Sequence, residues 1–236
     1  MISVCLAACN GERFIAQQLE SILASSRVSE VLVSDDGSVD ATREVVAGIG
    51  DPRVTLLSGP RQGVVRNFEF LLGQARGELI FLADQDDVWL PSKVDVMAAA
   101  LQRAGLAVSN CKVVDTELRE LHPSYFKLRG SRPGMLANLL RNSYLGCCMA
   151  LRRELLHDAL PFPADTPMHD WWLGLVAERL GSVCFIDEPL LLYRRHAGNL
   201  TPSAERSRAS PLKRLQWRLS LAKALVARRA ARPETG

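Results

Sequence analysis

The sequence predicts an α/β fold with a mainly parallel, Rossmann-like sheet flanked by helices. Apolar runs of strand length alternate with helical segments over residues 1–90, which is typical of βαβ units. Polar clusters follow three of these runs directly, at the position where ligands bind in such sheets. With 236 residues, of which 47% are hydrophobic, the chain is long enough to bury a full core.

The first two predicted strands each lead through a polar turn into a helix. A strand over residues 2–9 stops at Asn10, and apolar residues at helical spacing predict a helix over residues 11–25. A second strand over residues 31–33 ends in the segment SDDGS, and we expect Asp40 to cap the helix that follows. The scheme of strand, turn and helix therefore occurs twice in succession.

The third and fourth predicted strands bring further polar groups to the same edge. The third covers residues 53–58 and leads through a Gly-bearing loop into a helix. The fourth covers residues 78–83 and is followed by Asp84, Asp86 and Asp87. Because the carboxyl ends of parallel strands share one edge of a sheet, we expect these carboxylates to meet the polar turns of the first two strands.

After Pro91 the alternation becomes less regular. A helix over residues 92–105 and a strand over residues 106–115 are predicted, whereas residues 116–145 are rich in loops. Beyond them we expect a strand, a helix that begins near Asp170 and a final strand.

Basic residues are concentrated at the C-terminal end. The formal net charge is +3, but residues 201–236 hold nine Lys or Arg against two Glu, so residues 1–200 are net negative. A helix over residues 211–232 either lies on the anionic inner leaflet of a membrane or is an ordinary solvated helix packed on the body. Nucleic-acid binding is not expected, because the body is negative where phosphates would lie.

Cysteine usage and the apolar runs indicate the compartment. The six cysteines form no CxxC pair, which favours buried free thiols in a reducing environment. The apolar runs are far shorter than a membrane-spanning helix, and the N-terminal segment lacks the basic region of a signal peptide. We therefore expect a cytoplasmic protein.

The acidic and basic residues near the strand ends each have two interpretations. Asp84 and Asp86 either bind Mg²⁺ or Mn²⁺ that bridges a diphosphate, or form a solvated acidic turn. Asp36 either accepts hydrogen bonds from a base or ribose, or only ends a strand. Arg66, near a helix start, either meets phosphate oxygens or forms a surface salt bridge.

The segment MHDWWL leaves similar alternatives open. Asp170 is either a general base at the mouth of an acceptor pocket or a cap of the helix. His169, Trp171 and Trp172 either line that pocket or, in the case of the indoles, belong to the core. His196 either lies on the surface or supplies an imidazole ligand to the same metal.

Six motifs occur in order over residues 2–200: CNGERFIAQQLESIL, VLVSDDGSVDAT, GVVRNF, FLADQDDVWLPSK, HDWW and YRRHAGN. Together they resemble the family 2 glycosyltransferases, inverting enzymes with a GT-A fold, and in particular the bacterial rhamnosyltransferase-like branch that builds surface polysaccharides. The sequence departs from the family at ACN, where a Thr-Tyr-Asn or similar is common.

The resemblance implies a GT-A domain over residues 1–200, with a nucleotide-binding half (1–90) and an acceptor half (91–200), followed by a basic helical tail over residues 201–236. The residues that it implies for nucleotide binding are Ala8, Asn10, Glu12, Asp36, Arg66 and Asp84. The implied metal ligands, for Mn²⁺ or Mg²⁺, are Asp84, Asp86 and His196. Asp170 would be the catalytic base, and the implied acceptor contacts are His169, Trp171 and Trp172.

The activity implied by the resemblance is metal-dependent, inverting transfer of a sugar from a nucleotide-diphosphate sugar to a saccharide or lipid-linked acceptor. Family likeness makes dTDP-rhamnose a candidate donor. Two other classes are weighed against it. A nucleotidyltransferase would release pyrophosphate, and its usual Gly-rich, Lys-containing N-terminal loop is absent. A non-catalytic nucleotide-sugar-binding module would not need Asp170 beside the Trp pair.

Overall fold

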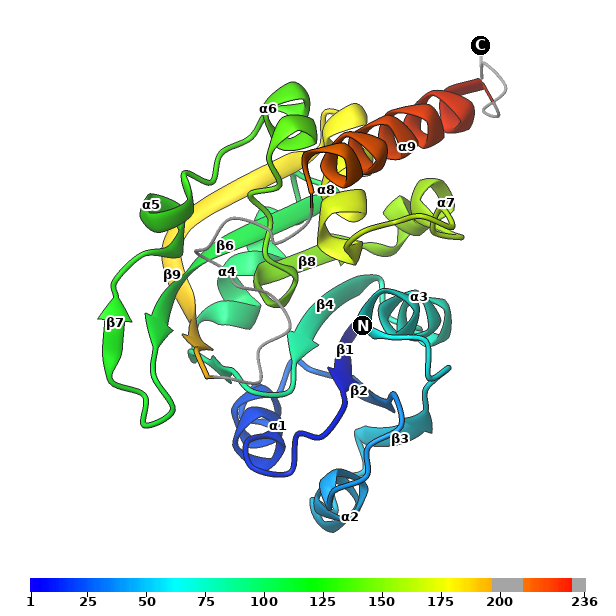
Figure 1. The fold of residues 1–236 in the computed structure, drawn as a ribbon. Coiled ribbons are helices and arrows are strands. Elements are labelled where there is room, and N and C mark those ends of the chain that lie inside the picture. The colour runs from blue at the N-terminus through cyan, green and yellow to red at the C-terminus, as the bar shows by residue number, and fades with distance from the viewer. Residues whose placement is uncertain (197–209, 231–236) are drawn as a thin grey trace.

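The computed structural model describes residues 1–196 and 210–230 of the chain (Figure 1). Its strands are β1 (Ile2–Ala8), β2 (Glu30–Asp35), β3 (Val54–Ser58), β4 (Leu79–Asp84), β5 (Val88–Trp89), β6 (Leu106–Val114), β7 (Glu120–His122), β8 (Met149–Arg152) and β9 (Val183–Arg194). Its helices are α1 (Ile15–Leu23), α2 (Thr42–Gly48), α3 (Val64–Gln74), α4 (Lys93–Ala100), α5 (Tyr125–Arg129), α6 (Met135–Leu140), α7 (Leu156–Ala159), α8 (His169–Arg179) and α9 (Pro211–Ala230).

Nine strands within the described ranges form one sheet in the order β3-β2-β1-β4-β8-β6-β9-β5, with β7 paired to β6. The strands of the N-terminal half, β1 to β4, pair in parallel. The short strand β8 then pairs antiparallel with both β4 and β6, and β9 runs parallel to β6. The parallel α/β sheet expected from the alternation over residues 1–90 is therefore confirmed, and the antiparallel pairings begin beyond it.

Helices cover both faces of the sheet because its central strands are apolar on both sides. In β1, Val4 and Leu6 belong to one hydrophobic cluster together with residues of α1, such as Leu19. Cys5 belongs to a second cluster, which includes Phe68 of α3. Successive side chains of a strand point to opposite faces, so this alternation assigns one cluster to each face. A strand buried on both faces reads as a continuous apolar run.

The register of the parallel strands brings their polar ends together. Ala8, at the end of β1, lies opposite Asp35 of β2, and Ala7 lies opposite Asp84 of β4. The expected convergence of the strand ends is thus what the structure has. Figure 1 shows these ends along the lower edge of the sheet, where α1 and α2 begin.

Several element boundaries differ from the sequence-based expectation. Asp40 does not cap α2 from the N-cap position, which is Ala41, although its carboxylate accepts a hydrogen bond from the Thr42 N–H at 3.1 Å. The helix expected near Asp170 begins one residue earlier, at His169. The region that the sequence predicts to be rich in loops contains β7, α5 and α6, which are too short to give a clear periodic signal.

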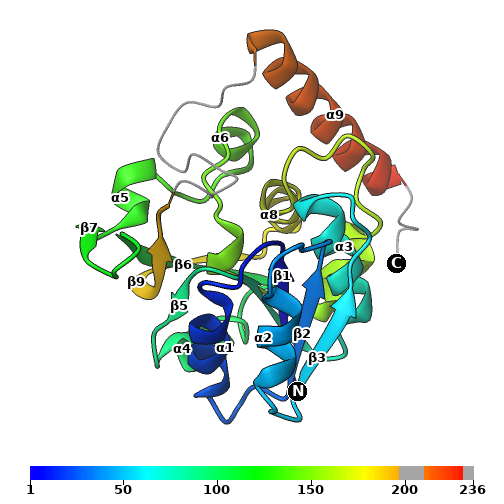
Figure 2. The same cartoon turned by 60° about the horizontal axis from the view of Figure 1, so that its bottom comes forward.

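The C-terminal segment is helical where the structure describes it. Helix α9 packs against α6 and α8, and Figures 1 and 2 both show it on the side of the molecule away from α1 and α2. Leu221 and Leu225 of this helix are buried in the second cluster. The remainder of the predicted tail, residues 201–209 and 231–236, lies outside the described residues. Within the described ranges, none of the helices is both long and apolar enough to span a bilayer.

Candidate active site

Three carboxylates lie at the end of β4 and in the turn after it, largely removed from solvent. Asp84 is the last residue of the strand and is half-buried, whereas Asp86 and Asp87 are 8% and 0% exposed. The strand brings them to the sheet edge because the apolar run before them, from Ile80 to Ala83, is completely buried. The acidic turn is therefore not the solvated turn that one interpretation of the sequence allowed.

The carboxylates of this turn repel one another. Burial, followed by the charges of Asp86 and Asp170, raises the pKa of Asp84 to about 8. Burial and the charges of Asp86 and Asp84 also raise the pKa of Asp87 well above its usual value. A cluster with this property favours either a bound proton or a bound cation.

A histidine and an arginine from the end of β9 hold the acidic turn in place. His196 Nε2 lies 2.8 Å from Asp86 Oδ2, so the structure brings together two of the three metal ligands implied by the family resemblance. The Arg194 guanidinium donates to the Asp86 carbonyl oxygen at 2.7 Å, and its backbone N–H donates to Asp87 Oδ1 at 3.0 Å. Arg194 is 2% exposed and was not identified from the sequence as part of the site.

The donor atoms of the turn fit a hard divalent cation. Asp84, Asp87 and Cys147 each offer one atom, and these atoms lie within 4.8 Å of one another. Asp87 Oδ2 is buried without a hydrogen-bond partner among the described residues. Carboxylate oxygen and imidazole nitrogen suit Mn²⁺ or Mg²⁺ better than a thiol does, so we assign Cys147 to the wall of the site rather than to its ligands. The cysteine gave no signal in the sequence, because it belongs to no ligand-spacing pattern.

Asp170 lies in the first turn of α8, near enough to the acidic turn for its charge to act on Asp84. Its Oδ1 accepts hydrogen bonds from the Trp171 N–H at 2.5 Å and from the Asn142 side chain at 3.1 Å. Burial raises the pKa of Asp170 to about 6, although the Gly146 N–H and these two donors lower it. A carboxylate whose pKa lies just below neutral pH is ionised at pH 7 and is still basic enough to accept a proton.

The aromatic neighbours of Asp170 are core residues, which corrects the acceptor contacts expected from the sequence. Trp172 has no exposed surface and donates from Nε1 to the Ala159 carbonyl at 2.8 Å. Trp171 is 8% exposed and donates to the Asn138 carbonyl at 2.7 Å. His169 is stacked on Phe68 with the ring centroids 3.9 Å apart, and burial lowers its pKa to about 3. The indoles occupy these positions because α8 is apolar around nearly its whole circumference.

The nucleotide-binding residues implied by the resemblance lie in loops that are bound to one another. Asn10 has φ of 52°, and its Oδ1 accepts from the Val39 N–H at 2.9 Å. The Ala8 carbonyl accepts from the Asp36 N–H at 2.8 Å, and Glu12 accepts from the Ala41 N–H at 2.8 Å. The first two strand-end loops therefore form one connected rim beside the acidic turn.

Asp36 continues this rim to the third loop. Its two carboxylate oxygens accept from the backbone N–H groups of Arg61 and Gly63, each at 2.7 Å. Gln85 closes the rim on the other side, because its side chain both donates to and accepts from the backbone of Cys9, at 2.9 and 2.7 Å. The structure thus places these residues around the strand ends, where they shape the loops.

Arg66 is the predicted site residue that the structure places elsewhere. Its guanidinium forms a salt bridge with Glu69 and donates to the carbonyl oxygens of Pro163 and Ala164 at 3.1 and 2.9 Å. These contacts attach α3 to the loop before α8. The expectation that Arg66 faces a base or diphosphate therefore does not match its position, because its donors are occupied by Glu69 and by carbonyl oxygens of the loop before α8.

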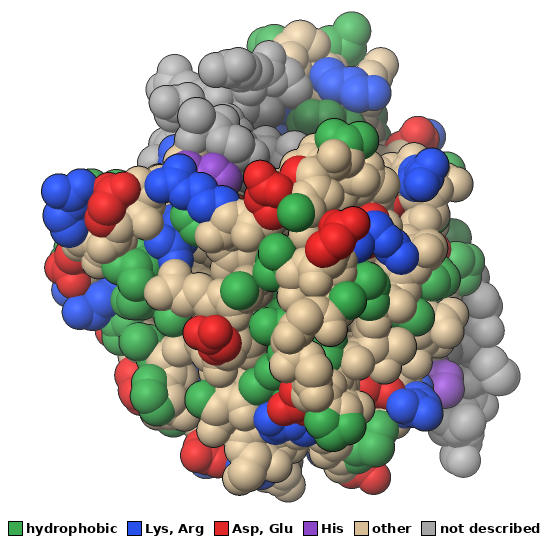
Figure 3. Space-filling view, turned by 90° about the horizontal axis from the view of Figure 1, so that it is seen from below, with side chains coloured by type: hydrophobic (Ala, Val, Ile, Leu, Met, Phe, Trp, Pro, Cys, Tyr) green, Lys and Arg blue, Asp and Glu red, His purple; other side chains and the backbone are tan. Residues whose placement is uncertain are grey.

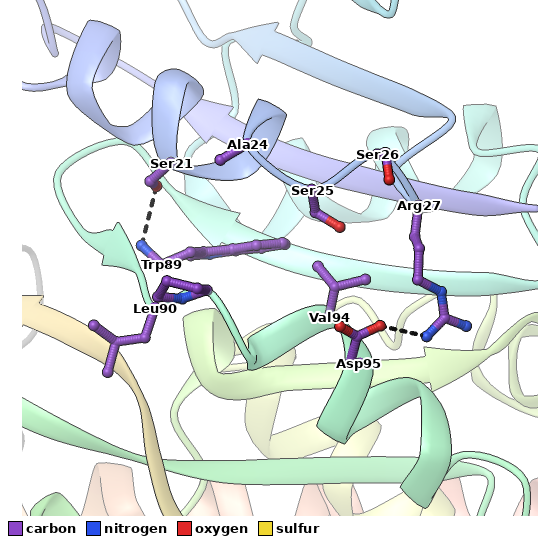
Figure 4. Close-up of a pocket in the computed structure, with 10 residues that line it drawn as sticks. Ser21, Ala24, Ser25, Ser26, Arg27, Trp89, Leu90, Val94 and Asp95 are labelled. Atoms are coloured by element: carbon purple, nitrogen blue, oxygen red, sulfur yellow. Dashed lines mark hydrogen bonds and ion pairs between the residues drawn. The ribbon is translucent and has the colours of Figure 1, made fainter.

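A cavity of about 320 Å³ lies at the opposite end of α1 (Figure 4). Ser21, Trp89 and Val94 line it, and the ion pair between Arg27 and Asp95 borders it. It contains none of the predicted site residues, because α1 runs back from the strand ends toward the amino ends of the strands. On the face drawn in Figure 3, basic, acidic and histidine side chains gather along the upper left of the view, whereas the charged side chains lower down stand singly or in pairs.

The model of the family described as "Glycosyl transferase family 2" matches residues 3–160. The chain is 39% identical over 126 residues to the succinoglycan biosynthesis protein ExoO of Rhizobium meliloti, a match that covers 51% of this chain and 36% of that protein. It is 24% identical over 173 residues to an Escherichia coli protein named UDP-Glc:alpha-D-GlcNAc-diphosphoundecaprenol beta-1,3-glucosyltransferase WfgD, covering 69% of this chain and 64% of WfgD.

Solved structures share the fold. Staphylococcus aureus TarS in complex with UDP-GlcNAc superposes with a TM-score of 0.70 at 18% identity, covering 96% of this chain and 66% of that one. The mannosyltransferase PcManGT of Pyrobaculum calidifontis, in complex with GDP-Man and Mn²⁺, gives a TM-score of 0.59 at 19% identity, covering 98% and 76%. The chain thus covers 36% of the length of ExoO, 64% of WfgD and 66% of the solved TarS chain.

Proposed function

Because this chain belongs to glycosyl transferase family 2, we propose that it transfers a sugar from a nucleotide-diphosphate sugar to a hydroxyl group of a saccharide or lipid-linked acceptor, with inversion at the anomeric carbon. Residues 1–90 would form the donor-binding half and residues 91–200 the acceptor half. The observation that carries the proposal is the acidic turn after β4, where Asp84 and Asp87 offer oxygen atoms within 4.8 Å of each other and His196 Nε2 lies 2.8 Å from Asp86 Oδ2. Asp170 of α8 lies near enough for its charge to act on Asp84.

Asp170 would act as the general base. Its carboxylate takes the proton of the acceptor hydroxyl while the hydroxyl oxygen bonds to the anomeric carbon. The bond between that carbon and the diphosphate oxygen breaks, and the nucleoside diphosphate leaves with the electron pair. Direct displacement of this kind inverts the anomeric centre. The Trp171 N–H, the Asn142 side chain and the Gly146 N–H hold the carboxylate in a fixed orientation.

The acidic turn would hold Mn²⁺ or Mg²⁺. Its ligands would come from Asp84, Asp86 and Asp87, with the imidazole of His196 beside Asp86. When bound, such a cation neutralises negative charge on the departing diphosphate. Mn²⁺ accompanies GDP-Man in the similar mannosyltransferase structure, which supports this proposal.

The donor, the acceptor and the place of action follow from relatives and from sequence likeness. The rhamnosyltransferase-like motifs favour dTDP-rhamnose, while the names of similar proteins carry UDP-glucose, UDP-GlcNAc and GDP-mannose. The WfgD name specifies an acceptor on diphosphoundecaprenol, which supports a lipid-linked acceptor for this chain also. A cytoplasmic location is proposed, since nucleotide sugars and reduced thiols both belong there.

The test measures which product is released. The protein is incubated with each of these four donors and Mn²⁺, with and without a panel of saccharide and lipid-linked acceptors, and nucleoside diphosphate and pyrophosphate are quantified. We expect acceptor-dependent release of nucleoside diphosphate, lost in Asp170→Asn and Asp86→Asn and retained in Asp95→Asn, whose carboxylate is exposed at the far cavity. Release of pyrophosphate, or binding without turnover for every donor, would contradict the proposal.

A further inference from the structure

Helices α6 and α9 together present an apolar surface to solvent. Large hydrophobic side chains that are 49–70% exposed lie on these two neighbouring helices, at Leu136, Leu140, Leu212, Leu215, Leu219 and Val226. We call these six residues the α6–α9 surface. Scattered single hydrophobic residues are normal on a protein surface, but a contiguous group of them indicates an interaction site.

The exposed residues of α9 are not the face that packs on the body. Leu221 and Leu225 are 1% and 6% exposed and belong to the second core cluster. Leu215 and Leu219 are spaced by four residues along the opposite side of the helix, so α9 has two apolar stripes. Only the inner stripe is explained by folding of the domain.

Cations flank the surface, and neither of its two helices carries an acidic residue. Arg132 and Arg141 flank α6, and Lys213 and Lys223 are exposed on α9. Residues 131–142 and 210–230 contain no Asp or Glu. An apolar stripe bordered by Lys and Arg is typical of helices that lie in the plane of an anionic membrane.

Helix α9 is fixed to the body at two places. Near its middle, the Arg218 guanidinium donates to the Leu140 carbonyl at the end of α6, at 2.6 Å. Near its end, Arg228 donates to the carbonyl oxygens of Asp158 and Leu160 at 2.6 and 2.9 Å and lies over the Trp172 ring. The α6–α9 surface therefore moves with the domain, so whatever binds it also orients the domain.

We propose that the α6–α9 surface docks the protein on an anionic lipid bilayer. The exposed leucines insert at the level of the headgroups, and the flanking cations face anionic lipids. Charge favours this occupant over a second copy of the chain, because two such surfaces would bring cations against cations.

Docking in this way would place the bilayer beside Asp170. Asn142 follows α6 closely and donates from its side chain to Asp170 Oδ1. The Asn138 carbonyl of α6 accepts from Trp171 Nε1, next to Asp170 in α8. The orientation suits an acceptor whose carrier lipid lies in the membrane. This consequence rests on the proposed glycosyl transfer, whereas the docking itself does not.

The experiment measures binding of the full chain to vesicles without donor or acceptor. Sedimentation with vesicles of phosphatidylglycerol and phosphatidylethanolamine is compared with sedimentation with phosphatidylcholine alone. The variants are Leu215→Ser with Leu219→Ser, and Lys213→Glu with Lys223→Glu. The matched controls are Leu121→Ser on β7, another exposed leucine, and Arg103→Glu, an exposed cation after α4.

We expect binding to the anionic vesicles that weakens with salt, and weak or no binding to phosphatidylcholine. The two leucine changes should weaken binding about tenfold or more. The double lysine reversal should weaken it about 25-fold or more, because each lysine lost costs about fivefold and each new glutamate repels anionic lipid, while both controls bind like the native protein. Because all the changed residues are exposed, the unfolding midpoint should not move. Absence of vesicle binding by the native protein, or equal losses in the controls, would overturn the proposal.

Two further measurements separate the remaining explanations. The first is analytical ultracentrifugation of the native protein and of Leu215→Ser with Leu219→Ser. A dimer that these changes dissociate, in a protein that does not bind vesicles, would assign the surface to a second copy of the chain and refute docking on a bilayer. If vesicle binding is found but no donor is turned over, the docking stands and the proposed transfer fails. If both hold, the variants should lose activity on a lipid-linked acceptor and keep it on a soluble saccharide.

Discussion

Replacement of Asp170 by Asn is expected to raise stability and abolish activity. The folded-state pKa of Asp170 is about 6, against 3.8 for the free side chain. The shift of about 2 units corresponds to about 3 kcal/mol at 1.36 kcal/mol per unit. Because the pKa is raised by folding, the favourable contribution is complete below pH 3.8 and is lost as the pH rises through 6.

Asparagine removes this cost but fits the site less well. The carboxylate accepts hydrogen bonds from the Trp171 N–H, the Asn142 side chain and the Gly146 N–H, and an amide offers only one oxygen for them. A donor left facing another donor costs about 1–2 kcal/mol. We therefore expect Asp170→Asn to be more stable than the native protein by about 1–2 kcal/mol at pH 8, and to lose this advantage near pH 4.5.

The assay is urea unfolding at the two pH values, in EDTA so that no metal affects the carboxylates. The control is Asp158→Asn, because Asp158 is a buried carboxylate with a cation beside it, Arg179 at 2.7 Å. Breaking that pair should destabilise the protein by about 3 kcal/mol at pH 8. The reasoning would be refuted by an Asp170→Asn variant that is less stable than the native protein at pH 8 and whose stability relative to the native protein is no lower at pH 4.5.

The same variant tests the role of Asp170 in catalysis. The native rate of sugar transfer should fall about tenfold for each pH unit below 6, since only the ionised carboxylate can take a proton. Asp170→Asn should be slower by a factor of about 10²–10⁴ at pH 8. Activity that persists in the variant, or that rises as the pH falls below 6, would show that another group is the base.

Three further changes address the scaffold of the site. Gly146→Ala should cost about 1–3 kcal/mol in urea unfolding, because its Cβ would overlap the buried His169 ring, and an unchanged midpoint would contradict the packing. Arg194→Met should lower the free energy of unfolding by about 3 kcal/mol or more, because several buried acceptors lose a charged donor. A decrease below about 1 kcal/mol would refute the inference that Arg194 holds the acidic turn in place. Gln85→Ala should raise the KM for the donor more than it lowers kcat, since its two hydrogen bonds to Cys9 shape the rim; equal effects on both would point to chemistry instead.

The sequence predicts the local features of this fold well, because they depend on neighbouring residues. The strand before Asp84 and the turn after it follow from a short apolar run and the polar residues that end it. Parallel pairing then places Asp35 beside the end of β1 without further information. The meeting of carboxylates at one sheet edge is a consequence of these two facts.

Features that depend on distant partners could not be predicted in the same way. Arg66 has the position and charge of a phosphate ligand, but its acceptors lie in the loop at residues 162–164. Trp172 reads equally well as a binding surface or as core, and only the packing of α7 and α9 around it decides for the core. Arg194 closes the acidic turn from the far end of the chain, so no local pattern indicates it.

The central claim is that the acidic turn binds a nucleotide-diphosphate sugar together with a divalent cation. Titration calorimetry of the native protein with dTDP-rhamnose, UDP-glucose, UDP-GlcNAc and GDP-mannose, in Mn²⁺ and in EDTA, tests it most directly. We predict that at least one donor binds in Mn²⁺, and that its binding is lost in EDTA and in Asp86→Asn but kept in Asp95→Asn. Donor binding that is indifferent to EDTA and to Asp86→Asn, or no binding of any donor, would contradict it.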